Sequence, residues 1–169
     1  MNPDKKIIIG ITAALVILVG IIVAASPNGS ENNQANVGTT LGASALTTDE
    51  PAFDFGTVSM SQGTVKHTFK IKNASAEQVK VAKIYTSCMC TTATLKRAGD
   101  ELGPFGMPGH GPIPKINQIF VPGEEAEVEV EFDPAAHGPA GIGLVERIIY
   151  LESSPSEILE LKFTAQVTP

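Results

Sequence analysis

TVKHTFKIK, residues 64–72, is the stretch that decides the fold, because its odd and even positions differ in character along its whole length. Val65, His67, Phe69 and Ile71 occupy one set of positions, and polar or basic residues occupy the other. Successive side chains of a strand point to opposite faces of a sheet, so this pattern predicts a strand with one buried and one solvated face. His67 is then expected to be a packed or hydrogen-bonded core histidine.

Further segments have the same two-residue period or a short apolar run bounded by turn residues. They are residues 53–58, 79–86, 126–132, 147–151 and 159–167. The glutamates that alternate with the apolar residues of 126–132 are expected to form a solvated strand face. No helical period follows the N-terminal region, so the pattern predicts an all-β fold, an antiparallel β-sandwich.

The N-terminal region has a different composition. Residues 7–25 contain no charged side chain, and a helix of this length spans about 28 Å, close to the thickness of the bilayer hydrocarbon. Lys5 and Lys6 precede it, so the positive-inside rule predicts a single transmembrane helix with residues 1–6 in the cytoplasm and the rest outside. A cleaved signal peptide is the alternative, because small residues precede Ser26, and it would leave a secreted or periplasmic domain.

Two segments follow this predicted anchor. Residues 26–51 are rich in Ser, Asn, Gly, Thr and Ala, a composition that predicts a flexible linker, and residues 52–169 are expected to form the sandwich domain. The formal net charge of −6 argues against binding to nucleic acid and to anionic lipid headgroups, both of which attract basic surfaces. The membrane is therefore expected to be contacted only through residues 7–25.

Several sequence strings together resemble the bacterial family called domain of unknown function 1573. They are FDFGTV (53–58), HTFKIKN (67–73), TSCMCT (86–91), PGEEAEVEVEFDP (122–134) and the closing alternating strand. The resemblance covers roughly residues 53–167 and implies an exported immunoglobulin-like (Ig-like) β-sandwich, without implying a reaction. This sequence departs from the family pattern in a Gly/Pro-rich insertion at residues 99–114.

Cys88 and Cys90 are the two cysteines of the chain. An exported protein would normally bridge them. In an extended strand, however, residues two apart have Cα atoms about 6.5–7 Å apart, at the limit for an unstrained bridge. Three roles stay open: bridged or free core cysteines, a metal site, and a thiol–disulfide redox pair. The redox role lacks the helix N-terminus that often lowers the pKa of a reactive thiol.

The metal hypothesis adds ligands from two loops. Met107 and His110 lie in the Gly/Pro-rich insertion, and His137 lies in a loop after the glutamate-rich strand. Thiolate, thioether and imidazole ligands together favour Cu(I), and Zn(II) becomes the better candidate if methionine is not a ligand.

The chain contains no nucleophile-elbow pattern, no phosphate-binding glycine loop and no HExxH motif, so no enzymatic activity is predicted. The leading hypothesis is a non-enzymatic, membrane-tethered Ig-like module that contacts a protein partner in the cell envelope. The alternatives are a Cu(I) or Zn binding protein that uses Cys88 and Cys90 with Met107 or His110, and a thiol–disulfide redox partner.

Overall fold

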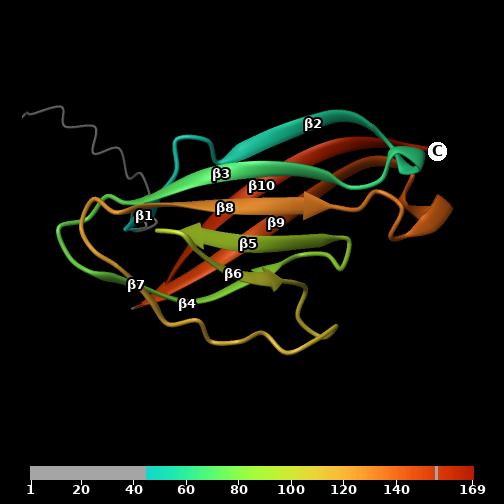
Figure 1. Ribbon diagram of the computed structural model, residues 1–169. Helices are drawn as coiled ribbons and strands as arrows, with labels where there is room; N and C mark the ends of the chain where they lie inside the picture. The colour runs from blue at the N-terminus through green and yellow to red at the C-terminus, as the bar shows by residue number, and fades with distance from the viewer. Residues whose placement is uncertain (1–44, 155) are drawn as a thin grey trace, which may run out of the picture. The chain divides into compact units, whose positions relative to one another are not determined.

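The alternating segments form two stacked β-sheets in the computed structural model, which describes residues 45–154 and 156–169 (Figure 1). The first sheet has the strand order β1-β3-β8-β5-β6, and the second has the order β2-β10-β9-β4-β7. The strands are β1 (Leu46–Thr47), β2 (Ala52–Ser59), β3 (Val65–Asn73), β4 (Val79–Thr86), β5 (Thr91–Arg97), β6 (Asp100–Phe105), β7 (Gln118–Phe120), β8 (Glu125–Phe132), β9 (Gly143–Ser154) and β10 (Glu157–Thr168). Two short 3₁₀ helices, η1 (Met60–Gln62) and η2 (Gly138–Gly141), complete the described elements.

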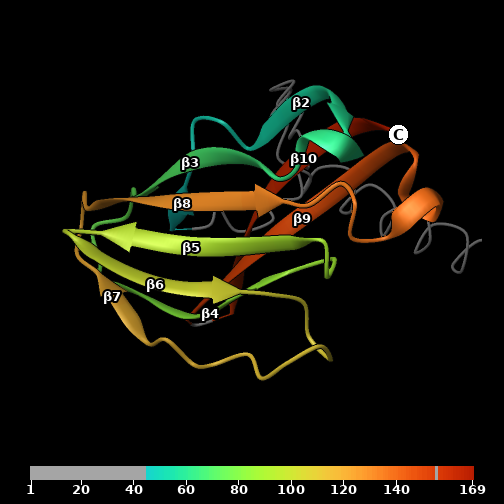
Figure 2. The same ribbon diagram turned by 45° about the vertical axis from the view of Figure 1, so that its right-hand side comes forward.

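The layers cross at an angle. In Figure 1, β3, β8 and β5 lie side by side in one layer while β9 and β10 run diagonally behind them, and Figure 2 shows the same arrangement after a turn of 45°. Each segment predicted as a strand forms one, which confirms the all-β sandwich. The two-residue period succeeded because each of these strands buries one face against the opposite sheet.

The prediction of a purely antiparallel sandwich is wrong for one pair. Strand β2 runs parallel to β10, with Phe53 opposite Phe163 and Val58 opposite Val167. The register shifts between Thr164 and Gln166, where a bulge lies in the pair. Periodicity identifies a strand but carries no information about the direction of its neighbour, so this feature could not be predicted from the pattern.

The sequence pattern missed three strands of the first sheet, β1, β5 and β6, and it missed β7 of the second. Strand β5 is rich in threonine, and β6 contains Pro104, a residue usually excluded from strand interiors. Proline is tolerated in β6 because this strand is at the edge of its sheet and pairs with β5 alone. A Cβ atom on Gly103 would lie 2.9 Å from the Ala93 carbonyl oxygen, so the close approach of the two strands requires glycine here. Part of the predicted insertion at residues 99–114 therefore forms strand β6 of the first sheet.

Strand β1 lies within residues 26–51, the segment predicted to be linker. Leu46 is fully buried, and Thr47 pairs with Lys72 of β3. The backbone N–H of Ala45 also donates a hydrogen bond to the Glu157 carboxylate at 2.7 Å. The folded domain therefore begins before residue 52, because a single leucine and a few hydrogen bonds are enough to attach this short segment.

The core lies between the sheets. Its largest fully buried side chains include Phe69, Phe120, Phe132 and Phe163. His67 stacks on Phe53 with ring centroids 3.6 Å apart, and its Nε2 lies 2.9 Å from the Glu50 carboxylate. The interpretation of His67 as a packed, hydrogen-bonded histidine is thereby confirmed.

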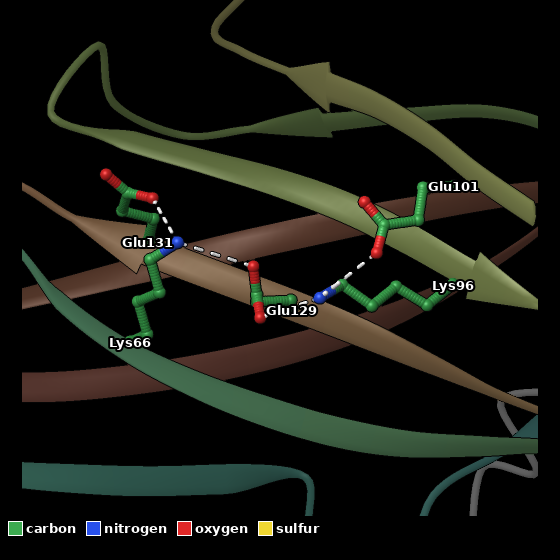
Figure 3. Close-up of polar contacts among 5 residues, drawn as sticks. All are labelled: Lys66, Lys96, Glu101, Glu129 and Glu131. Carbon is green, nitrogen blue, oxygen red and sulfur yellow. Dashed lines mark hydrogen bonds and ion pairs between the residues drawn. The ribbon is translucent and has the colours of Figure 1, made fainter.

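The outer side of the first sheet carries a row of ion pairs, shown in Figure 3. We call this side of the sheet the charged face. Lys66 of β3 contacts Glu131 and Glu129 of β8, with its Nζ 2.8 Å from the Glu131 carboxylate. Lys96 of β5 lies 2.9 Å from Glu129 and 3.4 Å from Glu101 of β6. The glutamates of 126–132 thus lie on a solvated strand face, as predicted, and pair with lysines of the neighbouring strands.

The predicted residues 1–6, transmembrane helix 7–25 and most of the linker lie outside the described residues. Within residues 45–154 and 156–169, no helix is long and apolar enough to cross a membrane.

Candidate functional site

Cys88 and Cys90 lie in the tight turn where the chain leaves β4 in the second sheet and enters β5 in the first. The backbone N–H of Thr91 donates to the Cys88 carbonyl at 3.2 Å, which closes the turn. The buried hydroxyl of Thr86 lies 2.9 Å from the Cys88 carbonyl and 3.0 Å from the Thr91 carbonyl, and it donates to this pair from beneath. The turn is therefore held by bonds that leave little freedom to its backbone.

In an extended strand the two cysteines would lie at the limit for an unstrained bridge. The turn brings their Cα atoms to 5.3 Å, and Cys88 and Cys90 form a disulfide. A separation of 5.3 Å is inside the usual range for bridged cysteines. Cys88 reaches an open hollow of about 540 Å³, whereas Cys90 lies beneath it and is 3% exposed.

Arg147 of β9 contacts the buried member of the pair. Its Nε donates to Cys90 Sγ at 3.2 Å. Two hydrogen bonds attach the cysteine turn to the neighbouring residue of β9: Ser87 N donates to the Ile148 carbonyl, and Ile148 N donates to the Ser87 hydroxyl, both at 2.9 Å. Burial lowers the pKa of Arg147, but a guanidinium remains protonated throughout the physiological range. A permanent cation therefore lies against one sulfur of the bridge.

His137 contacts the other sulfur. Its Nε2 lies 3.1 Å from Cys88 Sγ. The histidine ends the loop between β8 and η2, and this loop is tied to the cysteine turn by a 2.9 Å bond from Asp133 N to the Cys90 carbonyl. The Asp133 carboxylate in turn accepts a 2.8 Å bond from Ala135 N, which shapes the loop. His137, which the sequence placed in a loop, occupies a turn, and this turn brings its ring against Cys88 of the disulfide.

Met107 and His110, the loop residues of the metal hypothesis, line the same hollow as Cys88 and His137. A bond from Thr86 N to the Gly106 carbonyl, 3.1 Å long, holds the start of their loop against β4. Within the described residues, no hydrogen bond joins either side chain to a cysteine. The structure therefore gathers all five predicted site residues at one end of the sandwich and places His137 in direct contact with Cys88.

The residues that could hold a metal ion are Cys88, Cys90 and His137. Their Sγ and Nε2 atoms all lie within 4.8 Å of one another. The cysteines are buried and His137 is exposed, so such an ion would be bound at the edge of the hollow. We call the cysteine turn, residues 133–141 and Arg147 the cysteine end of the sandwich.

Arg147 is the site residue that the sequence pattern missed. It was expected only as the first residue of a buried strand, residues 147–151, and its contact with Cys90 is 57 residues away in sequence. A basic residue at an otherwise apolar strand is the one available indication, because a buried guanidinium needs a partner.

The comparisons with known proteins agree with the fold. Residues 46–103, which contain the cysteine turn, match the model of the family described as a protein of unknown function (DUF1573). This confirms the resemblance to that family. No curated protein has a significantly similar sequence.

Solved structures of similar fold include a protein of unknown function from Porphyromonas gingivalis W83, with 16% identity and a TM-score of 0.51. The match covers 72% of this chain and 46% of that one, so this chain spans less than half of its length. Another is a PapD-like domain of human CEP192, with 14% identity, a TM-score of 0.45 and coverage of 73% of this chain and 85% of that one. At these identities the likeness concerns the fold alone.

Proposed function

We propose that the protein is a non-enzymatic Ig-like module, tethered to the outer side of a membrane, that meets an envelope partner by thiol–disulfide exchange at the Cys88–Cys90 bridge. The observation that carries this proposal is the bridge itself, which lies in an open hollow with a histidine on one sulfur and an arginine on the other. The charge-free residues 7–25 after Lys5 and Lys6 support the tether, and an extracytoplasmic position suits a disulfide.

Arg147 supplies the positive charge beside a cysteine that the sequence motif lacked. A reactive thiol needs a stabilised thiolate, and a neighbouring guanidinium provides this as well as a helix N-terminus does. Because Nε of Arg147 already donates to Cys90 Sγ, the cation is in place before the bridge opens. Cys90 is therefore the better leaving group of the two, because the guanidinium stabilises the negative charge that the departing sulfur takes on.

Access from the hollow selects the sulfur that is attacked. Both cysteines are largely buried, but Cys88 is 9% exposed and lines the hollow, whereas Cys90 is 3% exposed and does not line it. A thiolate of the partner attacks Cys88 Sγ, a bond forms between the two sulfurs, and the Cys88–Cys90 bond breaks with its electron pair left on Cys90. The second thiolate of the partner then attacks its own sulfur in the mixed disulfide and releases Cys88 as a thiolate, which takes a proton from solvent. The two partner thiolates are oxidised by two electrons to a disulfide, and the bridge is reduced to a Cys88 thiol and a Cys90 thiolate beside Arg147.

The bridge contributes little to holding the fold. It closes a loop of three residues, and in the chain-entropy description so short a loop stabilises a protein by only about 1.6 kcal/mol, roughly half the value for a 15-residue loop. The turn is also held by Thr86, Ser87 and Ile148 without the bridge. The domain can therefore lose and regain the bond while it stays folded, as a redox module must.

The test uses the full chain in glutathione buffers of graded poise, with thiols counted by alkylation and the fold followed by circular dichroism. We expect two thiols to form together in one two-electron step, with the β-sheet spectrum unchanged. A bridge that opens only when the domain unfolds would overturn the proposal.

A matched pair of variants tests the direction of attack. Incubated with oxidised glutathione, Cys90→Ser is expected to form a mixed disulfide at Cys88 rapidly, because Cys88 lines the hollow. Cys88→Ser is expected to react at least about tenfold more slowly at the buried Cys90, since access limits exchange. Equal rates for the two variants would remove the assignment of Cys88 as the attacked sulfur.

A further inference from the structure

We infer that the reduced Cys88–Cys90 pair and His137 bind one Cu(I) ion through two thiolates and one imidazole. This inference rests on the proposed redox function, because only the reduced pair offers two thiolate ligands. It differs from the ligand set suggested by the sequence, in which Met107 and His110 accompanied the cysteines. His137 replaces both because its ring already contacts Cys88 Sγ.

The three ligand atoms lie close together, and they need to separate only slightly to reach the spacing of a metal centre. Protein ligands lie about 2.3 Å from a metal for sulfur and about 2.0–2.1 Å for imidazole nitrogen, so neighbouring ligand atoms are about 3.5–4 Å apart. The two sulfurs and His137 Nε2 all lie within 4.8 Å of one another, with 3.1 Å between Cys88 Sγ and the nitrogen. Reduction removes the bond between the sulfurs, and a small separation of the two side chains then opens the space between the three atoms.

The three ligands are held from independent directions. The cysteine turn is bonded to β9 through Ser87 and Ile148, and the His137 loop is bonded to the turn through Asp133 and Cys90. Gly141 packs behind the histidine: a Cβ atom there would lie 3.2 Å from His137 Cβ. Little reorganisation is therefore needed to present the ligands, and preorganisation of this kind favours binding.

Charge favours a monovalent ion. Two thiolates and Cu(I) together carry one negative charge, which the Arg147 guanidinium beside Cys90 balances. Zn(II) would leave a net positive charge on the partly buried group and would need a fourth ligand, since structural zinc sites are four-coordinate. Thiolate and imidazole ligands also match the softness of Cu(I). Glu146 lines the hollow as well, but it is exposed to solvent, and within the described residues its side chain makes no hydrogen bond to either sulfur.

The test titrates Cu(I) into the full chain, reduced and kept free of oxygen, against a competing Cu(I) chelator. We expect one equivalent to bind with sub-micromolar affinity and with the ultraviolet absorption of thiolate–copper charge transfer. Cys88→Ser and Cys90→Ser are each expected to weaken binding at least about 100-fold. His137→Gln is expected to weaken it at least about tenfold, because even residues that merely orient a ligand cost that much.

His110→Gln is the matched control, because this histidine lines the same hollow without contacting a sulfur. It is expected to leave the affinity unchanged. Binding that survives either cysteine substitution would overturn the inference, as would equal losses in His110→Gln and His137→Gln, or equally tight binding by the disulfide form. Zinc bound as tightly as Cu(I) would overturn the choice of metal.

The two proposals fail separately. Thiol counting in metal-free glutathione buffer reports on redox exchange alone, whereas the copper titration begins from protein that a strong reductant has already opened. If glutathione cannot reduce the bridge but the chemically reduced chain binds copper, the exchange function is excluded and the metal site stands. If the bridge exchanges with glutathione but the reduced chain does not bind copper, the metal site is excluded and the exchange function stands.

Discussion

The charged face and the cysteine end differ in the kind of contact that builds them. On the charged face, ion pairs link exposed side chains of neighbouring strands, as between Lys66 and Glu131. At the cysteine end, hydrogen bonds join a turn, a loop and a strand far apart in sequence; those of Thr86 within the turn are buried, and that between Arg147 and Cys90 is part-buried. Exposed ion pairs compete with water and contribute little, whereas a buried polar group that loses its partner is costly.

This difference means that the two regions should respond very differently to single substitutions. The cysteine end has the few contacts on which the local backbone depends, and the charged face has many contacts that replace one another. Four measurements would sharpen or break this contrast.

The largest effect is expected for Thr86→Val. The substitution keeps the shape of the side chain but removes the hydroxyl that donates to the Cys88 and Thr91 carbonyls. Removing this buried donor takes one hydrogen bond from each carbonyl and should lower the free energy of unfolding by about 2 kcal/mol, measured by urea denaturation. The control is Thr68→Val on the charged face, an exposed position where a change within about 0.5 kcal/mol is expected. Equal losses at both positions would break the contrast.

The next effect is that of reducing the bridge in the wild-type chain. Because the loop is so short, the free energy of unfolding should fall by about 1.6 kcal/mol, measured by urea denaturation with and without reductant. The Cys88→Ser, Cys90→Ser double variant serves as control and should show no further loss on addition of reductant. A loss of 4 kcal/mol or more would make the bridge a structural bond rather than an exchangeable one.

The third effect is that of Arg147→Gln on the reduction of the bridge, and we expect it to be similar in free energy to the second. Removing the cation beside Cys90 should destabilise the thiolate of the reduced pair, so that the dithiol-to-disulfide ratio at fixed glutathione poise falls about tenfold, equivalent to about 30 mV. Lys80→Gln removes an exposed cation from the same sheet and should leave the ratio unchanged. An unchanged ratio in Arg147→Gln would mean that the cation has no part in the exchange.

The smallest effect is expected on the charged face, for Glu129→Gln. This carboxylate accepts from Lys96 and also lies near Lys66, and both contacts lower its pKa. A carboxyl of lowered pKa stabilises the fold above its ordinary pKa, near 4, and the stabilisation is lost as the pH falls through the lowered value. The wild type should therefore exceed Glu129→Gln in stability by a small amount at neutral pH and match it in strong acid.

The ion pairs of the charged face should also weaken at high pH and at high salt concentration. Hydrogen bonding to Glu131 raises the pKa of Lys66, and hydrogen bonding to Glu129 raises that of Lys96. Their stabilisation is fully present below the ordinary lysine pKa and is lost as the pH rises through the raised values. The neutral-pH difference between wild type and Glu129→Gln should also shrink in about 1 M salt, where charges are screened within about 3 Å. If the stability difference between wild type and Glu129→Gln persists in strong acid and in high salt, it arises from a change in packing and not from the lost charge.

The sequence predicted the strands that bury one face, because the two-residue period is a direct consequence of strand geometry. It missed β5 and β6 for an equally physical reason: threonine and proline dilute the pattern in strands at or near a sheet edge. It also singled out the cysteines and the loop residues that the structure brings to one end of the sandwich, since cysteine, methionine and histidine are chemically distinctive wherever they lie, but it missed Arg147. It left the bridge between the cysteines open, because only the tertiary structure shows the turn that brings them together.

By itself, the sequence determined the charge-free N-terminal segment, the all-β class and the alternation that places glutamates and lysines on one outer face. These follow from local composition and period. Only the tertiary structure decided that β2 runs parallel to β10, that the cysteine turn crosses between the sheets, and that His137 and Arg147 meet its two sulfurs. These contacts join residues about 50 to 110 positions apart, and no local pattern encodes them. They exist because two sheets pack face to face and bring distant loops to one end.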